Sequence, residues 1–201
     1  EGFRRFTKRT FDLALSSIAL ILLSPVFLVI ALLVKFGSKG PVFFTQERVG
    51  LNGKHFKMIK FRSMVVDAED QLDLLQDQSE GAGVLFKMKN DPRVTKVGAV
   101  LRKYSLDELP QFVNVWLGEM SLVGPRPPLP SEVEQYEEWT HRRLLAPPGI
   151  TGLWQVSGRS NLSWEDSVRL DLYYVENWSL VGDIILLVRT VKTVLKPEGA
   201  Y

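Results

Sequence analysis

The chain has 201 residues, of which 45% are hydrophobic and 24% charged, a composition that indicates a folded core and excludes a disordered chain. It has no cysteine, which excludes disulfides and thiolate chemistry, and His55 and His141 lack metal-ligand spacing. The net charge of +2 hides an asymmetry. Residues 1–63 carry 11 basic and 3 acidic side chains, whereas residues 64–201 carry 14 and 20.

The basic side chains of the first part surround one long apolar run. Four precede the run and seven follow it: Arg4, Arg5, Lys8 and Arg9, then Lys35, Lys39, Arg48, Lys54, Lys57, Lys60 and Arg62. Anionic headgroups attract such clusters by about 1 kcal/mol per basic residue near the surface. Nucleic acid is the rival partner, but no recognised nucleic-acid module accompanies the charge. We therefore expect membrane lipids as partners and no nucleic acid.

The apolar run covers residues 11–36 and is interrupted by Ser24-Pro25. It is too long for the core of a typical signal peptide and lacks a cleavage site, so we expect it to be retained. One continuous helix would reach about 39 Å and cross the bilayer, whereas the two halves reach only about 20 and 17 Å. Proline removes the partner of the Ile21 carbonyl and bends the helix, yet membrane-spanning helices tolerate it. The residues alone leave a kinked spanning helix and a re-entrant helix both open.

We predict an α+β fold of mostly short helices with one β-hairpin. The hairpin covers residues 42–64 around the turn Asn52-Gly53. Ser131 and Glu134 form a predicted capping box, and Ser163 opens a later helix. The last helix is amphipathic and either packs on the core or lies in the membrane interface. The patterns predict helices at 66–78, 95–104, 107–118, 131–145, 163–177 and 181–195, a strand at 120–124, and a Gly/Pro-rich loop at 147–159.

Asp107 and Glu108 are the best candidates for chemistry. A purely structural explanation is available, because Asp107 could cap a helix with Pro110 in its first turn, or Ser105 and Glu108 could form a capping box. The two interpretations are compatible. A helix N-terminus favours the ionised carboxylate, which is the form that a nucleophile or a Mg²⁺ ligand needs.

Several basic side chains on stiff or turn-rich segments suggest phosphate recognition. Singly, each is more often a surface charge, but guanidinium groups match phosphate oxygens well. Trp154 and Gln155 offer an aromatic plane and an amide for a base, although a core tryptophan explains the pair equally well. No P-loop or G-x-G-x-x-G motif is present. The candidates for substrate binding are Lys60, Arg62, Arg102, Arg126, Gln155 and Arg159.

The chain resembles the bacterial sugar transferases, the monotopic polyprenyl-phosphate phosphoglycosyl transferases. The resemblance lies in KRTFDLALSSIALILLSPVF, GPVFFTQERVG, FKMIKFRSM, RKYSLDELPQFVNVWLGEMSLVGPRP and PPGITGLWQVSGR, which occur in the expected order. The terminal GAY is similar to the ends of larger members that start exopolysaccharide or O-antigen synthesis. Those members carry further membrane helices and a regulatory domain upstream, so we expect the catalytic domain of a larger protein.

The resemblance implies a fold, a location and a reaction. Residues 1–40 would be a basic leader and a re-entrant membrane helix turned at Ser24-Pro25, and residues 41–201 a catalytic domain on the cytoplasmic face of the bacterial inner membrane. The family depends on Mg²⁺ and transfers a hexose-1-phosphate from a UDP-sugar to undecaprenyl phosphate, releasing UMP. Glucose and galactose are both credible sugars, and a homodimer is a candidate assembly.

The resemblance also implies an Asp-Glu catalytic dyad at Asp107 and Glu108. We expect Asp107 to attack the β-phosphorus and Glu108 to help bind and orient Mg²⁺. Expected partners are Arg102 for charge neutralisation, Arg126 and Arg159 for the nucleotide or its phosphates, and Lys60 and Arg62 for headgroups or the polyprenyl phosphate. The alternatives are direct attack by the lipid phosphate and a non-catalytic scaffold that binds anionic lipids. A glycosidase fits poorly, because adjacent carboxylates rarely straddle a glycosidic bond.

Overall fold

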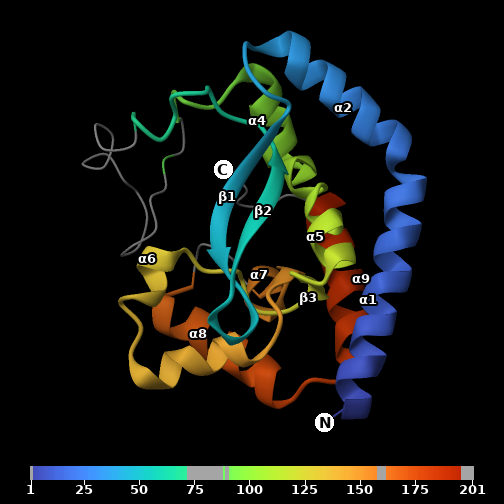
Figure 1. Ribbon diagram of the computed structural model, residues 1–201, viewed down its shortest axis with the longest axis vertical. Helices are drawn as coiled ribbons and strands as arrows, with labels where there is room; N and C mark the ends of the chain where they lie inside the picture. Colours follow the sequence, from blue (N-terminus) through green and yellow to red (C-terminus); the bar gives the residue numbers. More distant parts are fainter. Residues whose placement is uncertain (1, 72–87, 89–90, 158–161, 196–201) are drawn as a thin grey trace.

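The long apolar segment folds as two helices, α1 (Gly2–Leu22) and α2 (Ser24–Gly37), that meet at a bend of 61° along one side of the molecule (Figure 1). The Ser24 hydroxyl donates to the Ile21 carbonyl at 2.8 Å. This is the carbonyl that Pro25 leaves without a backbone partner. Pro25 therefore breaks the helix, and Ser24 supplies the hydrogen bond that the Ile21 carbonyl loses. Within the described residues no single helix is long and apolar enough to cross a bilayer, whereas the bent pair together has the length and composition.

The computed structural model describes residues 2–71, 88, 91–157 and 162–195, and the α+β prediction is confirmed there. The predicted hairpin is present as β1 (Phe43–Val49) and β2 (His55–Phe61), antiparallel, with left-handed Asn52 and Gly53 in the turn. The other elements are α4 (Lys96–Lys103), η3 (Leu106–Glu108), α5 (Gln111–Leu117), β3 (Ser121–Val123), α6 (Pro130–Val133), η4 (Glu138–Leu145), β4 (Gly149–Thr151), α7 (Leu153–Val156), α8 (Trp164–Glu176) and α9 (Leu180–Leu195).

Three element predictions differ from the structure. The helix expected at 107–118 is divided into η3 and α5, because Pro110 has no N–H to continue the first turn. The helix expected at 131–145 is also two elements. Its predicted capping box is wrong, since Glu132, not Glu134, accepts from a cap N–H, that of Leu129, at 2.9 Å. The segment expected to be a loop at 147–159 contains the strand β4 and the helix α7. The strand β4 pairs in parallel with β3.

A fourth difference concerns the segment after the hairpin. Residues 66–71 lie in turns where a helix was predicted, and residues 72–78 of that prediction lie outside the described residues. The remaining helices at 95–104, 163–177 and 181–195 and the strand at 120–124 are confirmed as α4, α8, α9 and β3. Ser163 caps α8 as predicted, because its hydroxyl accepts from the Asp166 N–H at 3.1 Å.

Two apolar clusters hold the elements together. The larger lies between the hairpin, β3, α8 and α9, and includes Met58, Val115, Val123 and Leu186. The smaller joins one face of α2, through Ile30 and Val34, to Phe61 of β2 and Leu101 of α4. The second half of the apolar segment therefore packs on the hairpin with one face. Its opposite face is exposed, as are the outer side chains of α9 (Val181, Ile184, Ile185, Val188 and Val191).

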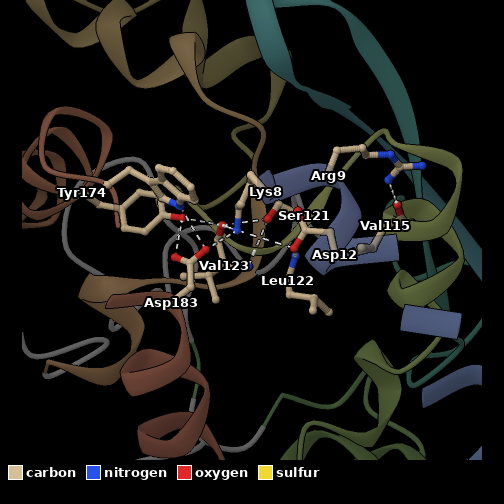
Figure 2. Close-up of polar contacts among 10 residues, drawn as sticks. Lys8, Arg9, Asp12, Val115, Ser121, Leu122, Val123, Tyr174 and Asp183 are labelled. Atoms are coloured by element: carbon tan, nitrogen blue, oxygen red, sulfur yellow. Dashed lines mark hydrogen bonds and ion pairs between the residues drawn. The ribbon is translucent and has the colours of Figure 1, made fainter. Parts of the chain in front are cut away.

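A buried ionic cluster joins α1 to the rest of the molecule (Figure 2). The Lys8 Nζ lies 2.6 Å from the Asp183 carboxylate of α9, 3.0 Å from the Val123 carbonyl and 3.5 Å from the Asp12 carboxylate. The Tyr174 hydroxyl lies 2.9 Å from the Asp183 carboxylate. Because Asp183 is fully buried, its charge depends on these partners. The cluster therefore links α1, β3, α8 and α9 at one point.

The cluster changes the role expected for part of the basic leader. Lys8 is buried and does not face headgroups, and Arg9 donates to the carbonyls of Val115 and Trp116 at the end of α5 at 2.6 and 2.7 Å. Carbonyls at a helix C-terminus favour such a cation. Only Arg4 and Arg5 of the four leading basic residues remain exposed for contact with headgroups.

We predict that Lys8→Met lowers the free energy of unfolding by about 3–5 kcal/mol, because it leaves the Asp183 carboxylate buried without its cation. Denaturant unfolding of the detergent-solubilised protein measures the change. Lys54→Met, at an exposed position in the hairpin turn, is the matched control and should change little. Adding Asp183→Asn should recover part of the loss. A Lys8→Met protein as stable as the control would contradict a stabilising role for the cluster.

Candidate functional site

Asp107 and Glu108 lie in the single turn η3, between α4 and α5. Ser105 precedes them in the left-handed conformation (φ 54°), which reverses the chain after α4. The Ser105 side chain forms no cap, and Asp107 lies inside the turn and not at its cap. Both capping explanations predicted for these carboxylates are therefore wrong. Helix capping therefore does not explain this pair of carboxylates.

Burial controls the charge of Asp107. The residue is 8% exposed, and the pKa of its carboxyl is raised from the ordinary 3.8 to about 6, mainly by burial. The neighbouring Glu108 carboxylate contributes to this rise, while the charges of Lys60 and Arg102 act in the opposite direction. The sequence predicted a helix N-terminus that favours the ionised form, but burial outweighs that effect. A carboxyl with a pKa near 6 is ionised at neutral pH and is a stronger base than an exposed aspartate.

Lys60 is the predicted binding residue that the structure brings to the dyad. It lies near the end of β2, and its Nζ is 2.7 Å from the Glu108 Oε1. Both side chains are partly exposed, so a substrate can reach the pair. The sequence associated Lys60 with headgroups or a polyprenyl phosphate, and its place beside Glu108 puts any such phosphate next to the dyad.

Arg102, in the last turn of α4, lies within electrostatic range of Asp107. Its charge lowers the pKa of Asp107, and the side chain is half-buried. The helix lies close to the strand segment after β2 because Gly98 has no side chain. A Cβ at Gly98 would lie only 1.8 Å from the Ser63 carbonyl oxygen. The glycine thus allows the close packing that brings α4 and its arginine to this side of the hairpin.

Arg48 is a buried cation that the sequence did not single out as a binding residue. It donates from β1 to the Pro127 carbonyl at 3.0 Å and to the Gln46 side chain at 2.6 Å. The pKa of the Arg48 guanidinium is lowered to about 10, mainly by burial and also by the Arg126 charge, while the charges of Glu132 and Glu108 oppose this fall. Arg48 therefore lies within electrostatic range of both the dyad and Arg126. Its only sequence signal is its place in an alternating strand.

Arg126 lies in the Pro-Arg-Pro segment after β3. Its Nη1 is 3.2 and 3.1 Å from the two carboxylate oxygens of Glu132, and about a quarter of the side chain is exposed. The predicted rigidity of this segment thus has a second source, an ion pair with a buried glutamate. Arg126 keeps an exposed portion that a phosphate can contact.

Two other predicted binding residues, Arg62 and Gln155, bond to partners outside the dyad. Arg62 is 5% exposed and donates to the Pro41 carbonyl at 2.6 Å and to the Ser38 hydroxyl and carbonyl at 2.8 and 3.0 Å. These bonds hold the end of α2 to the hairpin, which favours a structural role. Gln155, in α7, donates to the Ile150 carbonyl at 3.2 Å. Arg159 lies outside the described residues.

The dyad is the candidate position for Mg²⁺. No group of three or more His, Cys, Asp or Glu side chains in the described parts of the chain could hold a metal ion by itself. Mg²⁺ is commonly held by one or two carboxylates together with substrate phosphates and water. Two adjacent carboxylates at a partly exposed site fit that pattern. The residues therefore suit an ion that shares its ligands with a bound diphosphate.

The sequence matches a known family along almost its whole length. Residues 3–197 match the family described as "Bacterial sugar transferase". The chain is similar to an undecaprenyl-phosphate galactose phosphotransferase of Salmonella typhimurium, with 48% identity over 202 residues, 98% of this chain and 42% of that protein. It is 42% identical over 209 residues to a UDP-glucose:undecaprenyl-phosphate glucose-1-phosphate transferase of Escherichia coli, covering all of this chain and 43% of that protein.

A third relative is shorter. Exopolysaccharide production protein ExoY of Rhizobium meliloti is 46% identical over 198 residues, 96% of this chain and 88% of that protein. The chain therefore spans less than half the length of the first two relatives and most of the third. The shared region contains the dyad, the hairpin and the bent helix pair.

We predict that Asp107→Asn stabilises the protein increasingly as the pH rises from about 4 to 7 in the absence of Mg²⁺. The folded-state pKa of Asp107 is raised, so the stability that its protonated form contributes is complete at low pH and lost as the pH rises through about 6. The asparagine variant avoids this loss, which is at most about 3 kcal/mol. Unfolding free energies across this pH range measure it, with the exposed Asp70→Asn as control. A difference that does not vary with pH would contradict the raised pKa.

Proposed function

The chain belongs to the bacterial sugar transferases, and from this we propose that it transfers a hexose-1-phosphate from a UDP-sugar to undecaprenyl phosphate, releasing UMP. The observation that carries the proposal is the buried Asp107 beside Glu108, with Lys60, Arg102 and Arg48 around them. The names of the Salmonella typhimurium and Escherichia coli relatives give undecaprenyl phosphate as the acceptor and galactose or glucose as the sugar. We carry both sugars over to this chain as candidate substrates, and the product would begin an exopolysaccharide or O-antigen chain.

The first step is an attack of the Asp107 carboxylate on the β-phosphorus of the UDP-sugar. A bond forms between the Asp107 oxygen and phosphorus, the bond from phosphorus to the bridging oxygen breaks, and UMP leaves with that electron pair. In the second step an oxygen of undecaprenyl phosphate attacks the same phosphorus. The Asp107 carboxylate is released, and the sugar remains on a lipid diphosphate. Two smaller displacements replace one difficult displacement.

The cationic side chains address the main electrostatic difficulty, which is that an anionic nucleophile must approach an anionic diphosphate. Lys60 and Arg102 act on the dyad from β2 and α4, and Arg48 and Arg126 extend the positive charge towards the Pro-Arg-Pro segment. Fixed charges in a partly buried site stabilise developing negative charge without reorganisation. Mg²⁺ held by Asp107 and Glu108, when bound, would neutralise the diphosphate and the leaving phosphate.

We place the protein on the cytoplasmic face of the bacterial inner membrane, with α1 and α2 as a re-entrant pair. The support is the 61° bend, the short halves and the exposed apolar side chains of α2 and α9. Exposed apolar surface of this extent suits contact with lipid. In this arrangement the dyad lies near the headgroups, where a polyprenyl phosphate from the membrane and a soluble UDP-sugar can both arrive.

Asp107→Asn should abolish Mg²⁺-dependent UMP release, because the amide cannot form the phospho-sugar bond. UMP release is measured across a panel of UDP-sugars, with and without undecaprenyl phosphate. Asp70→Asn, at an exposed turn, should retain normal turnover. A phospho-sugar adduct on Asp107 should also be trapped when the lipid acceptor is withheld.

Two outcomes would reject parts of the proposal. Full turnover by Asp107→Asn would reject the covalent scheme. Loss of turnover in Asp107→Asn, combined with UMP release that always requires the lipid, would favour direct attack by the lipid phosphate with the dyad as metal ligand and base. No UMP release from any UDP-sugar by the unaltered protein would favour a non-catalytic scaffold that binds anionic lipids.

The double substitution of Ser24→Ala and Pro25→Ala should straighten the bent pair and move the N-terminus to the far side of the membrane. Because the chain has no cysteine, a Gly2→Cys label reports the side unambiguously through its reaction with an impermeant maleimide in spheroplasts. Ser17→Ala, at a partly exposed position of α1, is the matched control and should leave the label protected. A label that stays protected in the double variant would show that Ser24 and Pro25 do not set the topology.

A further inference from the structure

Asn114 is a polar side chain at the centre of the fold. It lies on α5 and is fully buried, next to Val115 of the larger apolar cluster. Its Oδ1 accepts from the Ile59 N–H at 3.0 Å, and its Nδ2 donates to the Lys57 carbonyl at 2.8 Å and to the Glu119 carboxylate at 2.7 Å. Both amide protons are used, which determines the orientation of the group.

The partners of Asn114 show what the amide does. Lys57 and Ile59 belong to β2, which pairs with β1 in a two-stranded sheet. Residues two apart in a strand present their N–H and C=O groups to the same edge. The Asn114 side-chain amide hydrogen-bonds to one C=O and one N–H on that edge, as the backbone of a neighbouring strand would. A helix side chain thus completes the edge of β2 and determines where the strand lies against α5.

The same two segments also meet at the dyad. Lys60 follows Ile59 directly, and its Nζ contacts Glu108 at 2.7 Å. Glu108 precedes Asn114 by six residues and is joined to α5 through Leu109 and Pro110, whose φ and ψ are helical. Two polar contacts therefore join β2 to the η3–α5 segment, one buried at Asn114 and one partly exposed at Lys60. The buried contact holds the strand while the exposed one can exchange partners with a substrate.

We propose that Asn114 is a positioning residue for this reaction, which holds β2 in register with α5 so that Lys60 meets Glu108 beside Asp107. The inference rests on the proposed transfer reaction and adds a residue that contacts neither carboxylate of the dyad. Loss of the amide would leave an N–H and a C=O of β2 without partners, and the strand would shift. Because the displacement reaction is sensitive to shifts of about 1 Å, kcat should fall about tenfold to a hundredfold. KM for the UDP-sugar should change far less.

A double-mutant cycle tests whether Asn114 acts through Lys60. Asn114→Ala is measured in the unaltered protein and in a Lys60→Met background, by kcat and KM for UMP release. In the otherwise unaltered protein we expect Asn114→Ala to lower kcat about tenfold to a hundredfold. In the Lys60→Met background we expect a change of less than about twofold, because the cation that Asn114 positions is already absent. Equal losses in both backgrounds would indicate a general structural role and overturn the proposal. Asn177→Ala, at the exposed asparagine that follows the end of α8, is the matched control and should leave kcat unchanged.

Asn114→Asp carries the same test if the alanine variant does not fold. The aspartate has nearly the same shape and still accepts from the Ile59 N–H, but an oxygen replaces the amide that faced the Lys57 carbonyl and the Glu119 carboxylate. The strand contact is weakened without a cavity. We expect a loss of kcat that again disappears in the Lys60→Met background, and an additive loss would overturn the proposal.

Hydrogen exchange separates this inference from the proposed function. In Asn114→Asp, amides of β2 and also of residues 105–110 should exchange faster than in the unaltered protein, because the strand and the dyad turn are held together. Faster exchange limited to β2 would overturn the coupling. This result does not depend on turnover. If the unaltered protein released no UMP, the proposed reaction would be rejected. The hydrogen-exchange result would still decide whether Asn114 couples β2 to the turn that carries the dyad.

Discussion

The ion pair between Lys8 and Asp183 is the contact on which the arrangement of this protein depends. A helix that continues into a membrane has no intrinsic orientation towards the domain that follows it. Here Lys8 reaches the Val123 carbonyl and the Asp183 carboxylate, so that α1, β3 and α9 converge at one buried charge (Figure 2). A buried carboxylate without its cation is strongly unfavourable, so the helix is held at one angle. In the proposed membrane arrangement, the depth of the dyad follows from that angle.

The bend at Ser24 and Pro25 acts together with this cluster. The cluster holds the first half of the apolar segment against the domain, and the bend turns the second half back towards the hairpin, where Ile30 and Val34 are buried. Arg62 then closes the connection through its bonds to Ser38 and Pro41. The bent helix pair is thus fastened to the rest of the fold near both of its ends.

The dyad lies where the hairpin, α4 and α5 approach one another. Each element contributes to the surroundings of the dyad. The strand β2 supplies Lys60, and the helix α4 supplies Arg102. The helix α5 supports the turn that carries Asp107. Burial of Asp107 raises its pKa towards neutrality, and the cations keep the rise moderate. The proposed nucleophile is therefore a carboxyl with a pKa of about 6, which is ionised at neutral pH and more basic than an exposed aspartate.

The sequence by itself determined the features that depend on local chemistry. Ser24-Pro25 predicted the break, Asn52-Gly53 the hairpin turn, Ser163 the cap of α8, and the adjacent acids at 107 and 108 the candidate dyad. Backbone dihedrals and capping are properties of a few neighbouring residues, so they can be read from the chain.

Only the tertiary structure decided which charges are used inside the protein. In the sequence, Lys8 and Arg62 look like surface cations for headgroups, yet both are buried and bond to groups inside the protein. The sequence pattern gave almost no indication that Arg48 is buried. The partners of Asn114 were also decided at this level. The physical reason is that burial and ion pairing join residues more than a hundred positions apart, such as Lys8 and Asp183. A local sequence pattern cannot show that such distant residues form an ion pair.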